Sequence, residues 1–215
     1  MPILSYILTA LAAYLLGSIP SGYLAGRAKG IDIRTVGSKN MGATNVFRTV
    51  GKTIGILVLL VDAFKGWAAV RLVAPWIMQA TAPNAPDQAL FVDSIIAAVC
   101  AVLGHNYTCW LQFKGGKGIA TTAGVTLALM PAALGISLAV WIVLFAATRY
   151  VSVASITAAA VLPFATFFTT RHSPTLTAFS AILGGLAIYK HKANIQRLRA
   201  GTENRISFKK KESTP

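Results

Sequence analysis

Long apolar segments occupy most of the chain, and they constrain its fold more than any other feature. The first runs from Ile3 to about Leu24, and a helix of roughly 20 apolar residues is enough to cross a bilayer. Because lipid offers no hydrogen bonds to the backbone, such segments cross as helices. No basic stretch precedes this one, so we expect a helix of the mature protein rather than a signal peptide. With 55% hydrophobic and 12% charged residues, we expect an all-α, polytopic membrane protein.

Seven apolar runs are candidate transmembrane helices, near residues 3–24, 54–78, 90–110, 119–131, 132–148, 152–170 and 175–190. The fourth and fifth are either two short helices or one long helix kinked at Pro131. Basic residues collect on the cytoplasmic side of membrane proteins. With seven spans, the basic segments 27–52 and 104–118, Arg149 and the tail from Lys190 all share one side, which a merged helix would not allow. We therefore predict seven transmembrane helices, an external N-terminus and a cytoplasmic C-terminus.

Composition also limits the partners. No repeat divides the chain, so we expect one membrane domain over residues 1–215, with 190–215 as a cytoplasmic tail whose end is disordered. The net charge of +14 suits topology signals and anionic lipid headgroups, but it is split among loops without a nucleic-acid recognition motif. Cys100 and Cys109 have no metal-like spacing and are expected to be packed free thiols. We expect no metal, no cofactor, no nucleic acid and a monomer.

The first basic loop, "GIDIRTVGSKNMGATNVFRTVGK" at residues 30–52, has the composition of a phosphate site. Gly37 and Gly42 permit tight turns in which backbone amides converge on an anion. Arg48 adds a planar fork suited to phosphate. Neutral hydrogen-bonding side chains accompany it: Ser38, Asn40, Thr44 and Asn45. The alternative is a turn capped by serine and asparagine before the next helix.

The second loop, "LQFKGGKGIATTAG" at residues 111–124, places Lys117 among three glycines at the start of an apolar helix. A helix N-terminus attracts anions through its unpaired amides and its dipole. The pattern differs from a nucleotide-binding P-loop, which needs G-x-x-x-x-G-K-[ST] after a strand. If the helix begins early, Lys114 and Lys117 face the same way. The loop is therefore a phosphate site or a plain basic membrane anchor.

Further polar residues stand at helix ends on the same side. Ser152 and Ser155 open the sixth apolar run, as N-caps or as substrate ligands. His191 and Asn194, three residues apart, share a helix face. His172 falls in a loop that is predicted to face outward, so it is not a candidate site residue.

Asp62 and Lys65 lie one turn apart inside the second apolar run. Charges in a membrane segment are costly, so they pair or face a polar cavity. We interpret them as a buried ion pair that supports the cytoplasmic cavity rather than as substrate ligands.

Three stretches together resemble the cytoplasmic motifs of the bacterial acyl-phosphate-dependent glycerol-3-phosphate acyltransferases, in the same order. They are "GSIPSGYLAGRAKGIDIRTVGSKNMGATNVFR" at 17–48, "GHNYTCWLQFKGGKG" at 104–118 and "HKANIQRLRAGTE" at 191–203. The chain departs from the family at Lys39, which replaces a glycine that would make the turn more flexible. Thr108 and Cys109 replace the more usual proline and valine.

The resemblance implies a reaction in the bacterial cytoplasmic membrane, on its cytoplasmic face. The 1-hydroxyl of glycerol 3-phosphate attacks the carbonyl of an acyl phosphate, giving 1-acylglycerol 3-phosphate and phosphate, the first step of phospholipid biosynthesis. It also implies that phosphate is held, or substrate oriented, by Ser38, the Ala43 backbone, Arg48, Lys117, Ser155, His191 and Asn194, with Ser152 as a second candidate serine. Of these, Ser38, Lys117, His191 and Asn194 are the predicted catalytic residues.

The sequence leaves two questions open. The general base is His191, His105 or a substrate phosphate, and of these we favour the substrate phosphate. The rival function is transport of phosphate-bearing anions. Transporters generally bind at the bilayer midplane between repeated halves, whereas this chain gathers its polar groups at one face.

Overall fold

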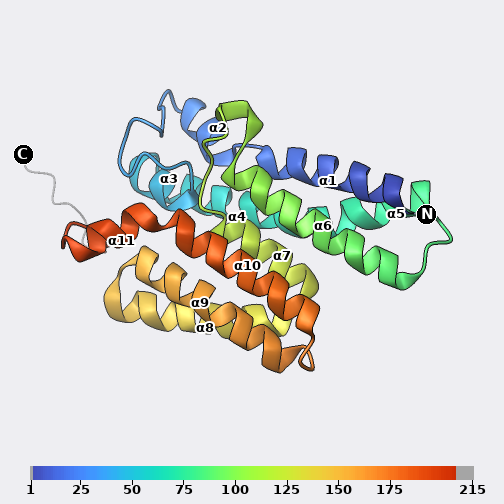
Figure 1. Cartoon of the computed structure of the whole chain (residues 1–215). Helices are drawn as coiled ribbons and strands as arrows, with labels where there is room; N and C mark the ends of the chain where they lie inside the picture. Colours follow the sequence, from blue (N-terminus) through green and yellow to red (C-terminus); the bar gives the residue numbers. More distant parts are fainter. Residues whose placement is uncertain (1, 207–215) are drawn as a thin grey trace, which may run out of the picture. The chain divides into compact units, whose positions relative to one another are not determined.

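A computed structural model describes residues 2–206, and within that range every regular element is a helix, so the all-α prediction is confirmed (Figure 1). The chain forms two compact units, the first ending at Leu134 and the second beginning at Gly135. Each unit is described by itself. Each of the seven predicted apolar runs coincides with helical structure.

The first unit opens with α1 (Ile3–Ser18) and α2 (Ser21–Arg27), which are separated at Ile19 and Pro20. Proline has no N–H to donate and its ring crowds the preceding turn, which explains the break. A loop over residues 28–42 then leads to the short helix α3 (Ala43–Thr49).

The second apolar run is one continuous helical stretch with a widened turn in it. It consists of α4 (Lys52–Ala68), the π-helical turn η1 (Ala69–Val73) and α5 (Ala74–Thr81). Pro75 is the second residue after this turn. It has no N–H to donate and its ring crowds the preceding turn, which the wider turn accommodates.

The first unit continues with α6 (Asp87–Asn106), the short 3₁₀ turn η2 (Cys109–Leu111) and α7 (Ile119–Leu129). After α7 the chain leaves the helical conformation at Met130, where φ is −150° and ψ is 67°, and α8 (Pro131–Thr148) begins. The stretch around Pro131 is therefore two helices, not one kinked helix.

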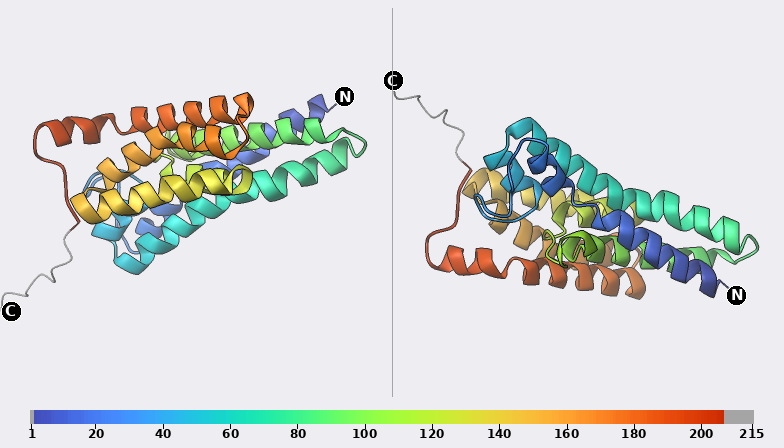
Figure 2. Two further views of the ribbon diagram at one scale, coloured as in Figure 1. Left: turned by 90° about the horizontal axis from the view of Figure 1, so that it is seen from below. Right: turned by 90° about the horizontal axis from the view of Figure 1, so that it is seen from above.

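Small residues bring the helices of the first unit into backbone contact. Gly17 of α1 lies against the carbonyl of Ala101 in α6, where any side chain would collide, and Figure 2 shows the two helices side by side. Gly124 of α7 lies in the same way against Ala63 of α4. Close packing of this kind holds helices together where lipid supplies no hydrophobic driving force.

The second unit contains the rest of α8, then α9 (Val151–Thr169), α10 (Pro174–Lys190) and α11 (Lys192–Arg199). Helices α9 and α10 pack along each other. The tail folds back after α11, and the N–H of Ile206 donates to the carbonyl of Arg149 in the turn between α8 and α9, at 3.0 Å.

Four helical stretches are long and apolar enough to cross a membrane: Ile3–Arg27, Asp87–Leu111, Pro131–Thr148 and Val151–Thr169. Large apolar side chains point outward along these helices, among them Leu11, Val143 and Phe168. The count of seven spans, the orientation of the termini and the single domain stay predictions. The expected disorder at the end of the tail concerns residues outside those described.

Candidate functional site

The loop before α3 is held in shape by Asn45, whose side chain is 2% exposed. Its amide nitrogen donates to the carbonyls of Ile33 and Val36, at 3.0 and 3.2 Å, and its oxygen accepts from the N–H of Ser38 at 2.9 Å. Gly37 adopts a φ of 59° directly above this amide, where a side chain would collide with it. Asn45, expected among the substrate ligands, therefore has all its polar groups engaged in fixing the loop that carries Ser38.

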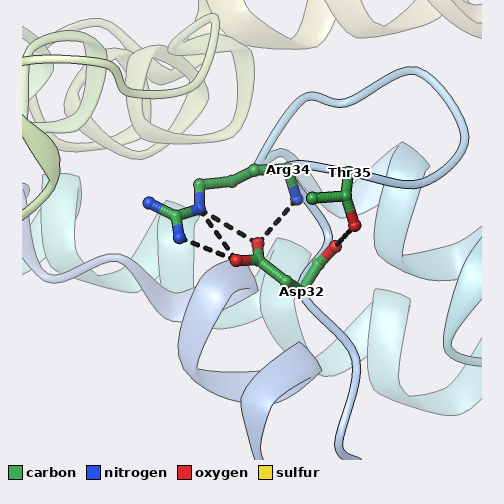
Figure 3. A network of polar contacts seen from close by, with 3 residues as sticks. All are labelled: Asp32, Arg34 and Thr35. Carbon is green, nitrogen blue, oxygen red and sulfur yellow. Dashed lines mark hydrogen bonds and ion pairs between the residues drawn. The ribbon is translucent and has the colours of Figure 1, made fainter.

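Asp32 and Arg34 form an ion pair that also stabilises this loop (Figure 3). The Arg34 guanidinium binds the Asp32 carboxylate with a shortest distance of 2.7 Å, and Thr35 donates its hydroxyl to the Asp32 carbonyl. The hydrogen bonds from the Arg34 guanidinium and from the Arg34 N–H lower the pKa of Asp32 to about 2. Arg34 also stacks on Tyr23 at 4.7 Å, so this arginine belongs to the scaffold of the loop.

The other predicted ligands of the first loop lie at its surface. Arg48 is exposed on α3, and Ser38 and Thr44 are half-buried. Asn40 uses its side-chain oxygen to accept the N–H of Gly42 at 2.8 Å, next to Ala43, the first residue of α3.

The glycine-lysine loop packs tightly against the end of α6. The N–H groups of Gly115 and Gly116 donate to the carbonyls of Asn106 and His105, at 3.2 and 3.0 Å. Gly118 adopts a φ of 81° and ends the loop, and α7 begins one residue later. The helix thus starts after Lys117, so the early start that would align the two lysines does not occur.

The two lysines of this loop differ in burial. Lys114 is exposed, whereas Lys117 is half-buried between glycines. An ammonium in a partly desolvated position acts on a nearby phosphate more strongly than one in water. The structure therefore separates the lysines, with Lys117 in the better position to neutralise an anion.

The expected ion pair is present behind this loop. Lys65 Nζ lies 2.8 Å from Asp62 Oδ1, and both side chains are almost fully buried. Ser21 donates its hydroxyl to the same oxygen at 2.6 Å, and His105 Nδ1 lies 3.5 Å from it. The pair is thus part of a four-residue polar cluster in the first unit.

In the second unit, the Glu203 carboxylate binds two predicted site residues and one arginine. Ser152 and Asn194 both donate to Oε1, at 2.8 and 2.7 Å, and Arg197 donates to Oε2 at 2.7 Å. Burial opposes ionisation of Glu203, but the hydrogen bonds from Asn194, Ser152 and Arg197 outweigh it and lower the pKa of the carboxyl. The side chain of Glu203 is only 5% exposed.

His191 forms the junction of α10 and α11 and is 3% exposed. Its Nδ1 lies 2.7 Å from the carbonyl of Ala187, which only accepts hydrogen bonds, so Nδ1 carries a proton. In the neutral ring Nε2 is then the basic nitrogen. Ser155, in turn, accepts a hydrogen bond from the indole of Trp141 at 3.1 Å.

A cavity of about 470 Å³ lies at the turn between α8 and α9. It is lined by Ala146, Ala147, Thr148, Arg149, Arg205 and Ile206. Arg205 stacks on Tyr150 at 4.7 Å, which fixes its guanidinium beside the cavity.

The predicted residues are divided between the two units. The loops of Ser38 and Lys117 belong to the first unit, and in the second unit Glu203 brings Ser152 and Asn194 together. Sequence reasoning did not single out Glu203, although it is the one acidic residue in the basic stretch 190–206, a signal that could have found it. Within residues 2–206, no group of three histidine, cysteine or acidic side chains is arranged to hold a metal ion.

Comparisons with known proteins cover nearly the whole chain. A family model described as glycerol-3-phosphate acyltransferase matches residues 7–201. A glycerol-3-phosphate acyltransferase of Geobacter sulfurreducens is 47% identical over 202 residues, 93% of this chain and 96% of the relative. That of Fusobacterium nucleatum is 43% identical over 196 residues, 91% of this chain and 95% of the relative.

Two solved structures match as well. Both are crystal structures of PlsY, an integral membrane glycerol 3-phosphate acyltransferase, and each covers 94% of this chain and 96% of the solved chain. The glycerol 3-phosphate form has a TM-score of 0.81 at 37% identity, and the lysophosphatidic acid form has a TM-score of 0.80 at 36% identity.

Proposed function

The chain belongs to the glycerol-3-phosphate acyltransferase family, and from this premise we propose that its acyl donor is an acyl phosphate. It is a multi-pass membrane acyltransferase that acylates glycerol 3-phosphate. The observation that carries the proposal is the half-buried Lys117 in a glycine loop, a setting suited to the phosphates of both proposed substrates. Solved relatives bound to glycerol 3-phosphate and lysophosphatidic acid support the same substrate and product here.

The proposed reaction needs the protein to position the substrates and neutralise their charge more than to take part in proton transfer or covalent chemistry. The 1-hydroxyl oxygen of glycerol 3-phosphate bonds to the acyl carbonyl carbon, and the bond from that carbon to the phosphate oxygen breaks. Inorganic phosphate leaves, and the hydroxyl proton passes to a substrate phosphate oxygen. Because the acyl group is already activated, orientation and electrostatic stabilisation supply most of the rate.

In the first unit, we assign phosphate binding to Ser38, Lys117 and Arg48. Asn40, Ala43 and Thr44 supply further hydrogen-bonding groups at the same loop. Asn45 contributes through the loop that it fixes, since its amide holds Ser38 in place.

In the second unit, His191 and Asn194 are proposed to orient substrate. Asn194 is fixed by Glu203, and the Nδ1 proton of His191 leaves its basic nitrogen at Nε2. Ser155 is the proposed substrate-contacting serine, because the hydroxyl proton of Ser152 is already donated to Glu203.

We further propose that the protein is a monomer of the bacterial cytoplasmic membrane with seven spans and a cytoplasmic site. The N-terminus is external in this arrangement, and the acyl phosphate arrives from the surrounding lipid. The clustering of basic residues in segments 27–52 and 104–118 and in the tail supports this orientation.

A donor assay tests the proposal. Purified protein in lipid is given glycerol 3-phosphate with either a palmitoyl phosphate or a palmitoyl thioester, with chelator present and no added cofactor. We expect acylglycerol phosphate and inorganic phosphate from the acyl phosphate alone. Turnover of the thioester instead would overturn the donor, and phosphate movement across vesicles without acylation would favour the transporter.

A further inference from the structure

Three side chains converge on one carboxylate oxygen in the first unit. Asp62 Oδ1 accepts from Ser21 at 2.6 Å, lies 2.8 Å from Lys65 Nζ and lies 3.5 Å from His105 Nδ1. Asp62 is 1% exposed, Lys65 is 3% exposed and His105 is 8% exposed. A buried charge is expensive unless it is paired and fully hydrogen-bonded, and more so inside a membrane segment.

The cluster joins elements that are far apart in the sequence. Asp62 and Lys65 come from α4, Ser21 begins α2, and His105 lies in the last turn of α6. Lys65 also donates to the carbonyl of Ile19, at 3.0 Å, where α1 is interrupted before α2. Asp62, the side chain that contacts His105, is thus itself held by residues of α2 and α4.

His105 in turn supports the glycine-lysine loop through both its backbone and its ring. Its carbonyl accepts the N–H of Gly116 at 3.0 Å. Its ring lies so close to the Gly116 backbone that a methyl group there would collide with Nε2, while two further ring atoms stand only 3.0 and 3.1 Å from the methyl position. Lys117 is the next residue, so the ring sets the path of the backbone that presents the ammonium.

We propose that His105 is a positioning residue: held by Asp62, it fixes the conformation of the Gly115–Gly118 loop in which substrate phosphate is bound. The inference rests on the proposed function, because it assigns phosphate binding to this loop. It also removes His105 from the candidate general bases, since its Nδ1 faces Asp62 and its Nε2 faces the backbone of Gly116.

Kinetics of His105→Ala distinguish positioning from proton transfer. A loosened loop should raise the KM for glycerol 3-phosphate, acyl phosphate or both by about 10- to 100-fold, the scale of a binding group misplaced by about 1 Å. The pH profile of kcat should keep its shape. A loss of kcat with both KM values unchanged, together with loss of the acidic limb of that profile, where a base becomes protonated, would identify a general base instead.

The contact between ring and glycine gives a second, independent test. Gly116→Ala should be severely impaired because its methyl group meets the ring, and the double variant Gly116→Ala/His105→Ala should recover part of the lost kcat/KM. No recovery in a folded double variant would refute the positioning role. If His105→Ala does not fold, His105→Asn, which keeps a hydrogen-bond donor toward Asp62, takes its place in both tests.

Two controls separate the possible failures. His172→Ala removes an exposed histidine from the turn after α9 and should leave all kinetic constants unchanged. If the wild type shows no turnover of acyl phosphate, the proposed function fails. If the wild type turns over normally and His105→Ala matches it in both KM values, only the positioning role fails.

Discussion

Asn194 donates its amide hydrogen to Glu203, nine residues later in the chain, at 2.7 Å, so the tail after α11 fixes a residue proposed to orient substrate. The same carboxylate oxygen accepts from Ser152 of α9. The Glu203 side chain thus links α9, α11 and the tail after α11 by hydrogen bonds.

Glu203→Gln should therefore lower both activity and stability. The neutral amide keeps its size and one acceptor oxygen, but it loses the charge that attracts Arg197, and an NH₂ group in place of Oε2 cannot accept from Arg197. We expect the free energy of unfolding to fall by about 2 kcal/mol, the usual scale for hydrogen bonds to a charged group, and kcat/KM to fall about 10- to 100-fold. Asp87→Asn, which neutralises an exposed carboxylate, is the matched control. Equal changes in unfolding free energy and in kcat/KM in the two variants would contradict the role of Glu203.

The stabilising effect of Glu203 should disappear in acid. Because the folded state lowers the pKa of this carboxyl, its contribution is complete above the ordinary value of about 4.3 and is lost as pH falls through the folded pKa. The difference in unfolding free energy between wild type and Glu203→Gln should be constant from about pH 7 to 5 and shrink below about pH 4. A difference that stays constant down to pH 2 would show that the charge plays no part.

Lys117→Ala should reduce kcat by about 100-fold or more, because it removes a partly desolvated positive charge from the phosphate site. Lys117→Arg keeps the charge but replaces a compact ammonium with a planar fork, so it should recover only part of the activity. Lys114→Ala, three residues away and exposed, is the control and should remain near wild type. Near wild-type turnover in folded Lys117→Ala would show that the loop is only a basic membrane anchor and not a phosphate site.

Gly118→Ala should impair substrate binding more than the same substitution at Gly30, another glycine with positive φ. Gly118 has a φ of 81°, and an added methyl group would lie 2.7 Å from the Asn106 side-chain oxygen. Gly30 has a similar φ of 72° but open space around it, so Gly30→Ala costs only the backbone strain of about 1 kcal/mol. We expect a clearly raised KM for Gly118→Ala alone, and equal KM values in the two variants would argue against a role of this loop.

The proposed topology can be checked by labelling. In a background without Cys100 and Cys109, an impermeant thiol reagent applied to intact cells should modify Asn84→Cys and spare Lys39→Cys. Permeabilised cells should label both positions, which shows that each is accessible. The reverse pattern in intact cells would place the basic loops outside and refute the cytoplasmic site.

The helices were predictable because lipid and backbone chemistry allow few alternatives. The run near 54–78 is helical as expected, and the separation at Pro131 follows from the charge argument. The π-helical turn before Pro75 was not predicted, since periodicity does not show how a helix absorbs a proline.

The site was predictable only as a collection of residue types. The composition of the first loop suggested that Asn45 contacts a ligand, but a side-chain amide can also hold a loop, and only the fold shows where its hydrogen bonds go. Similarly, nothing in the spacing of Asp62, His105 and Gly116 shows that they lie together. Long-range polar contacts of this kind depend on how the helices pack.

The contact of Gly17 with Ala101 has a consequence for how the first unit responds to cold. Hydrophobic association weakens on cooling because it depends on water released from apolar surface and carries a large heat-capacity change. A backbone-to-backbone contact within lipid releases little water, so its strength should vary little with temperature. The pairing of α1 with α6 is therefore expected to persist at the low temperatures at which many water-soluble proteins begin to lose stability.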